Sequence, residues 1–212
     1  MLQIRWTDPD IWKNQWLYLG ARIGGAIGFY NFDYSYLGSN ASAKNSLSLN
    51  AAIHASLQIK PLFAIQTEVL YLQDSVDVDY WLSFQNTFKS NSLIIPLMGK
   101  MTFRPNNFSI EGFGGVYISI PLGALEYGEL DLYSDSGLTN TKQNFNNTFG
   151  LLIGGSFGIK AGPGIAFADV RYLYDLNGTK TKIHRAPDSE LYRRRKILLS
   201  IGYNIGLISK NK

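Results

Sequence analysis

His54, Ser56 and Glu68 are the residues of this sequence whose types could carry out acyl transfer. A histidine can take the proton of a serine hydroxyl and so make it a nucleophile, while a carboxylate orients the histidine. The same types also occur inside proteins as satisfied polar pairs, because buried acids and histidines normally have partners. Two interpretations therefore stay open: a serine-dependent hydrolase site, or an interior pair of His54 with Glu68.

The segment that carries His54 and Ser56 has a period of two. From position 47 to position 59 the odd residues are apolar, whereas the even residues are mostly polar. A helix cannot produce this alternation, since its apolar residues recur every three to four positions. The elements that position the candidate residues are therefore β-strands, and all three candidates fall on polar faces.

Eight segments of this kind follow one another along the chain. The expected strands begin near Leu17, Leu47, Phe63, Leu93, Phe108, Phe149, Ile165 and Ile197. Most match the ~9–11 residues that a tilted strand needs to cross a bilayer. Short turns are expected at 60–62, 104–107 and 161–164, and they alternate with long polar loops at 31–45, 74–91, 121–147 and 176–195.

This arrangement predicts an all-β fold, namely an eight-stranded antiparallel up-and-down transmembrane β-barrel of the bacterial outer membrane. We expect the barrel over residues 15–208, a lead-in at 1–14 and a tail at 209–212. The first residues lack the basic start and apolar stretch of a secretory signal. We therefore expect either a protein that is not exported or a chain whose secretory signal has already been removed.

The composition of the 212 residues excludes several classes of protein. Only 17% of the residues are charged, against about a quarter in ordinary soluble domains. The absence of cysteine excludes disulfide scaffolds and thiolate metal sites. No apolar run reaches the ~18 residues of a membrane-spanning helix. We expect no cofactor and no metal, since the spacing of Asp74, Asp77 and Asp79 lacks the glycine and distal glutamate of a calcium loop.

The polar faces of the strands are expected to point into the barrel. A water-exposed outer face would carry roughly 25–35% charged residues, whereas these faces consist mainly of Gly, Ser, Ala and Asn. If the polar faces pointed outward instead, the chain would form a soluble lipocalin-like ligand-binding barrel, which is the alternative fold. Because eight strands enclose a space that side chains fill, interior charges would plug the lumen. The expected lumen charge network consists of Arg22, His54, Glu68, Lys100, Glu111, Lys160, Asp169 and Arg171.

Hairpin geometry predicts how these interior charges meet. Pairing about the turn at 60–62 places His54 opposite Glu68, and pairing across 104–107 places Lys100 opposite Glu111. Cross-strand neighbours of opposite charge stabilise a sheet, and an unpaired buried charge costs several kcal/mol. The third hairpin places Asp169 and Arg171 inward beside Ser156 and Gly154.

A further pattern is carried by five segments, namely 69–72, 94–100, 112–117, 170–174 and 200–204. These segments resemble the PorT-like outer-membrane β-barrel domain family, and the likeness extends from about Trp16 to Leu207. The most particular segment contains Ile-Pro-Leu, and we expect its Pro96 to lie at a β-bulge because proline removes a donor from the ladder. The resemblance implies an eight-stranded outer-membrane barrel with no agreed activity.

The order and spacing of His54, Ser56 and Glu68 are also similar to those of the outer-membrane lipid A deacylases. That resemblance implies a lipid-modifying enzyme whose serine attacks an acyl group. Against it, all three residues fall on the face assigned to the lumen, which a lipid substrate cannot reach. We therefore expect a protein that is not an enzyme, with the lipid-modifying enzyme kept as the alternative.

A basic cluster near the C-terminus is a candidate loop for an anionic ligand. Arginine binds phosphate in a fork geometry, so such a cluster at the outer surface could contact lipopolysaccharide. The alternative is a solvated loop, since surface charge runs rarely mark sites by themselves. The cluster consists of Lys180, Lys182, Arg185, Arg193, Arg194 and Arg195.

The expected partners are outer-membrane lipid, lipopolysaccharide and other envelope proteins. No nucleic acid is expected, because the other basic residues are scattered along the chain. The expected role is structural or interactive, through the long extracellular loops or as an accessory subunit of an envelope assembly.

Overall fold

The computed structural model describes residues 15–32, 42–43, 46–80, 84–105, 107–122, 126–129, 139–142, 146–177, 179–180 and 190–209. Every regular element within these ranges is a β-strand. None of the residues in them forms a helix that is long and apolar enough to cross a membrane. The expected lead-in at 1–14 and the last three residues of the expected tail lie outside the described residues.

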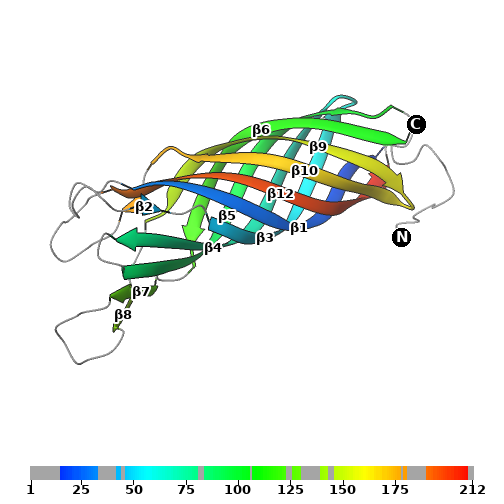
Figure 1. Ribbon diagram of the computed structural model, residues 1–212. Coiled ribbons are helices and arrows are strands. Elements are labelled where there is room, and N and C mark those ends of the chain that lie inside the picture. The colour runs from blue at the N-terminus through cyan, green and yellow to red at the C-terminus, as the bar shows by residue number, and fades with distance from the viewer. Residues whose placement is uncertain are drawn as a thin grey trace.

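Eight long strands form a closed antiparallel barrel (Figure 1). Each strand pairs with the next, and β1 also pairs with β12, so no long edge is left unpaired along the wall. The eight strands are β1 (Gln15–Phe32), β3 (Ser46–Lys60), β4 (Phe63–Tyr80), β5 (Phe84–Phe103), β6 (Phe108–Pro121), β9 (Thr148–Ala161), β10 (Gly164–Asp175) and β12 (Glu190–Ser209). The eight-stranded barrel that the sequence predicts is thereby confirmed.

Three tight connections join strands at one end of the barrel, at the positions that the sequence predicts. They lie between β3 and β4, between β5 and β6, and between β9 and β10. The last of them contains Gly162, whose φ of 57° lies in the left-handed region that glycine adopts at no steric cost. Gln15 pairs with Ser209, so the barrel strands begin and end at this same end.

The opposite end of the barrel carries longer connections with short strands. They are β2 (Ser42–Ala43), β7 (Glu126–Glu129), β8 (Thr139–Lys142) and β11 (Thr179–Lys180). β2 pairs with β4, β11 pairs with β12, and β7 pairs with β8 in a separate hairpin. Figure 1 shows β7 and β8 projecting from this end.

Two expected loop boundaries are wrong. The expected loop at 74–91 is a continuation of β4 and β5, which stay paired from Asp74 with Ser90 up to Tyr80 with Phe84. The expected loop at 176–195 ends earlier, because β12 begins at Glu190 and pairs Arg195 with Phe29. A backbone ladder between neighbouring strands needs no apolar face, so polar composition alone did not indicate where these strands end.

Pro96 does not lie at the expected bulge. The register between β4 and β5 is the same on both sides of Pro96, since Thr67 pairs with Leu97 and Leu70 pairs with Ile94. On its other side Pro96 pairs in register with Tyr117. The proline removes one donor without shifting the ladder, and its carbonyl accepts a hydrogen bond from Thr67 Oγ1 at 3.0 Å.

The apolar faces of the strands point outward and the polar faces point into the barrel, as the sequence predicts. Outward side chains such as Ile23, Leu47 and Ile201 are 62%, 79% and 66% exposed. Inward polar side chains such as Asn50 and Glu68 are buried. This apolar exterior is the opposite of a lipocalin-like soluble barrel, whose outer face would be charged.

Candidate functional site

A network of ion pairs occupies the middle of the barrel. Glu68 Oε1 accepts hydrogen bonds from Arg22 Nη2 at 2.8 Å and from Arg171 Nη1 at 2.7 Å. Arg171 also donates to Asp169 Oδ2 through Nε at 3.0 Å and Nη2 at 2.8 Å. All four side chains are at most 2% exposed. Each buried charge thus has at least one partner of opposite sign, as a dry interior requires.

A second group of polar side chains lies toward the short-turn end. Lys100 Nζ lies 2.6 Å from Glu111 Oε2, and Ser156 Oγ donates to the same carboxylate at 3.0 Å. The expected direct pairing of Lys100 with Glu111 is wrong by two residues, because Lys100 pairs with Phe113 in the ladder and Glu111 pairs with Thr102. The two charged residues are therefore diagonal neighbours. Diagonal neighbours are still within the reach of a long side chain.

Gln66 joins the two groups of charges. Its Oε1 accepts from Lys100 Nζ at 2.9 Å, and its Nε2 donates to Glu68 Oε2 at 3.5 Å. The polar contacts therefore continue from Glu111 through Lys100 and Gln66 to Glu68. Lys160 occupies an inward position near the end of β9 and is partly exposed.

The expected contact between His54 and Glu68 is wrong, although the two residues are directly paired in the ladder. His54 Nε2 instead donates to Asn204 Oδ1 at 2.5 Å. The His54 ring also lies edge-on to Phe167, with 5.8 Å between ring centres. Glu68 binds the two arginines instead, because hydrogen bonds between two charged groups are stronger than those to a neutral group.

These contacts do not assemble the residues of a hydrolase. The partners of the Glu68 carboxylate are Arg22, Arg171 and Gln66, so the carboxylate does not orient His54. His54 Nδ1 has no hydrogen-bond partner among the described residues. Ser56 is 5% exposed on the inward face of β3.

Apolar side chains fill the other half of the interior, although the alternation with a period of two predicts a polar lumen. The cluster consists of Ala26, Ala52, Leu70, Leu72, Ile94, Met98, Phe113, Tyr117, Leu152, Leu173 and Leu198. A signal for it exists in the sequence, because strands that are apolar on both faces read as continuous apolar runs. Segments 69–72 and 93–98 are runs of this kind.

Polar groups are also buried beside this apolar cluster. Tyr117 Oη donates to Asp175 Oδ1 at 2.5 Å. Lys196, next to the basic cluster in sequence, is 2% exposed inside the barrel. The cavity that Tyr117, Asp175 and Lys196 help to line has a volume of about 10 Å³. The cavity beside His54 and Asp169 is equally small, at about 10 Å³, which is about the minimum for one water molecule.

The family model for the outer membrane protein beta-barrel domain matches residues 13–180. The chain belongs to this family. The apolar exterior is therefore the surface that faces membrane lipid, and the protein is located in the bacterial outer membrane.

Solved outer-membrane barrels have the same fold at low sequence identity. The outer membrane protein OprG from Pseudomonas aeruginosa is 14% identical, with a TM-score of 0.56 over 92% of this chain and 99% of that one. Neisserial surface protein A is 17% identical, with a TM-score of 0.52 over 90% and 96% of the two chains. No curated protein matches this chain in sequence.

Arg195 is the one charged side chain at an outward strand position between the two ends of the barrel, among the side chains that the structure describes. Its guanidinium carbon lies 5.5 Å from the ring centre of Tyr174, and Phe29 is its partner in β1. A cation over an aromatic ring is attracted to the face of that ring. In a barrel of this family, an arginine costs little near the membrane surface but about 2–4 kcal/mol at the midplane.

The remaining basic candidates are not placed. Lys182 and Arg185 lie outside the described residues, as do the side chains of Lys180, Arg193 and Arg194. The backbones of Arg193 and Arg194 belong to β12, so these two residues are part of the barrel wall and not of a free loop.

Proposed function

We propose that this protein is a non-enzymatic outer-membrane barrel whose lumen is closed to solutes and which acts through its extracellular end. Its role there is structural or interactive, by contact with other envelope components or as an accessory subunit of an envelope assembly. The observation that carries the proposal is the packing of the interior, where ion pairs and apolar side chains follow one another along the barrel.

Two physical arguments support a closed lumen. Eight strands enclose an interior that is only wide enough for side chains, and the two interior cavities at the ion pairs and the apolar cluster are each about 10 Å³. A hydrated ion that passed through the lumen would have to separate side chains that are buried as ion pairs. Each charged side chain left without its partner costs several kcal/mol.

Single-channel recording in planar lipid bilayers tests the proposal. The wild-type barrel should give no conductance steps after its insertion has been verified by heat-modifiable migration on gels. The variant Leu72→Ser/Leu198→Ser replaces two fully buried side chains of the apolar cluster by small polar ones, and it serves as the control that admits water. Salt-dependent conductance steps from the wild type would refute the closed lumen.

We further propose that the extracellular end contacts the phosphates of lipopolysaccharide through Arg195 and its basic neighbours. The exposed side chain of Arg195 lies on the lipid-facing side, between Phe29 of β1 and Tyr174 of β10. This position suits a phosphate at the membrane surface, because arginine donates two parallel hydrogen bonds to phosphate.

Within the family, the segment 94–100 favours a PorT-like barrel. Its Pro96 is buried and its neighbours continue both ladders in register. This finer assignment is carried by sequence resemblance, and it implies no particular activity.

A further inference from the structure

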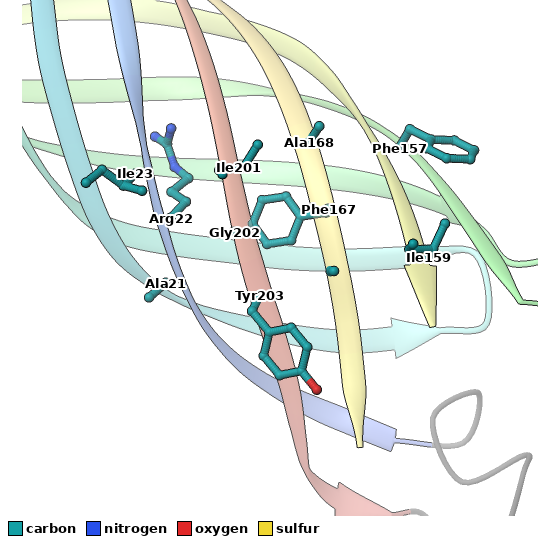
Figure 2. A pocket seen from close by; sticks show the side chains of 11 residues that line it. Ala21, Arg22, Ile23, Phe157, Ile159, Phe167, Ala168, Ile201, Gly202 and Tyr203 are labelled. Atoms are coloured by element: carbon teal, nitrogen blue, oxygen red, sulfur yellow. The ribbon is translucent and has the colours of Figure 1, made fainter. Parts of the chain in front are cut away.

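A groove of about 680 Å³ crosses the outward face of β1, β12, β10 and β9 (Figure 2). The groove is open along its length and not an enclosed pocket. Most of its lining residues occupy outward positions, so the groove opens to membrane lipid and not to the lumen.

The groove exists because two successive outward positions of β10 carry only methyl groups. These are Ala166 and Ala168, which form the floor. Their ladder partners on both sides are large, and they form two parallel walls: Tyr203 and Ile201 on β12, and Ile159 and Phe157 on β9. The floor and the two walls form the part of the groove that runs along β10, and the groove continues beyond β12 to Ala21 and Ile23 of β1. Figure 2 shows Phe157 and Ile159 on one side of β10 and Ile201 and Tyr203 on the other.

The groove lies at the short-turn end of the barrel. Ala166 is the third residue of β10, directly after the turn that contains Gly162 and Pro163. Tyr203 borders this end, where its Oη donates to the carbonyl of Ala161 at 2.5 Å. In outer-membrane barrels the short turns are periplasmic, so the groove is level with the periplasmic leaflet.

The lining excludes a charged or strongly polar occupant. Arg22 borders the groove only from the lumen side, since its side chain is 0% exposed and its guanidinium is bound to Glu68. The other lining residues are apolar, apart from the Tyr203 hydroxyl, which already donates to Ala161. A headgroup or a charged peptide would therefore find no partner, whereas a hydrocarbon chain needs none.

A second copy of the barrel fits this surface poorly. A twofold interface brings the same patch of both copies together. Two concave channels that face each other leave a void, and the atoms that line a void lose their van der Waals contacts. A flexible acyl chain can instead follow the groove and contact both its floor and its walls.

We propose that this groove binds one acyl chain of a phospholipid in the periplasmic leaflet. The gain comes from close packing against the Ala floor and the two walls, and not from removal of water, because lipid tails are already in an apolar environment. The site is independent of the closed lumen and of the extracellular contacts.

Native mass spectrometry of the full chain tests the site. The protein, purified in detergent with added phosphatidylethanolamine, should retain one phospholipid molecule. The variant Ala166→Leu/Ala168→Leu fills the floor, and it should lower the bound fraction about tenfold or more. Ala55→Leu is the matched control, because Ala55 takes an outward position on β3 and does not line the groove. Heat-modifiable migration of all three proteins establishes that each has folded.

Each other outcome overturns the proposal in a distinguishable way. Equal retention by the wild type and the floor-filling variant, or no retention by the wild type, shows that the groove holds no acyl chain. A parallel measurement with lipopolysaccharide separates the two leaflets, since a loss of lipopolysaccharide in the variant would assign the groove to the outer leaflet. A wild-type dimer that the variant dissociates would identify the groove as an interface between copies.

Discussion

Glu68 and Arg171 meet across the full width of the barrel, with 2.7 Å between Oε1 and Nη1. Glu68 belongs to β4 and Arg171 to β10, which lie four strands apart in a closed ring of eight and therefore on opposite walls. Arg22, from β1, binds the same carboxylate oxygen at 2.8 Å. One carboxylate thus connects three separate parts of the wall through the centre of the lumen.

Replacement of this carboxylate should destabilise the barrel strongly. Glu68→Gln keeps the size of the side chain but leaves Arg22 and Arg171 with Asp169 as their nearest anion. Breaking a buried ion pair from one side costs roughly 3–5 kcal/mol, because the remaining charge is uncompensated.

Urea unfolding in lipid vesicles measures the free energy of unfolding. Lys60→Gln, at an exposed position beside a turn, is the control and should stay within about 0.5 kcal/mol of the wild type. Equal stability of the two variants would contradict a structural role of the network.

Two glycines of β6, Gly112 and Gly115, should respond differently to an added methyl group. A Cβ at Gly115 would lie 2.0 Å from the carbonyl oxygen of Leu97 and 2.8 Å from Met98 Cα, both in the backbone of β5. A Cβ at Gly112 would meet nothing within 4 Å. Gly115→Ala should therefore cost about 1–3 kcal/mol or more through overpacking, and Gly112→Ala should fold as the wild type does. The folded fraction on unheated gels measures both, and equal behaviour would show that β5 and β6 approach less closely than described.

Binding of lipopolysaccharide should depend on salt and on the basic end of β12. Arg195→Gln should weaken binding about twofold to fivefold at low ionic strength, in line with the usual strength of exposed ion pairs. The effect should fade as salt is added, since exposed charges are screened. Lys60→Gln, at the other end of the barrel, controls for net charge. Salt-sensitive binding that survives replacement of Arg193, Arg194 and Arg195 together by glutamine would refute the proposed contact.

The purified protein should release no fatty acid from lipid A. Ser56 is buried on the lumen face, and the Glu68 carboxylate is bound to two arginines and Gln66. The assay compares the wild type with Ser56→Ala after both have been shown to fold. Activity in the wild type that Ser56→Ala abolishes would establish the lipid-modifying enzyme instead.

The sequence by itself determined the number of barrel strands, the short turns and the direction of most side chains, but not where the strands end beside the long connections. Alternation with a period of two places His54 and Glu68 on inward faces, because successive side chains of a strand point to opposite sides. Turn residues such as Gly162 then set which strands are neighbours. These features are local, so a single segment of chain is enough to indicate them.

Only the tertiary structure decided which interior groups meet. The Glu68 carboxylate binds arginines from β1 and β10 although His54 is its ladder partner. Contacts across a lumen depend on the tilt and stagger with which the barrel closes, because these set the height of each residue along the axis. The groove beside Ala166 and Ala168 has the same origin. Its walls come from β9 and β12, and β12 is separated from β10 in sequence by a long connection whose length does not determine their register.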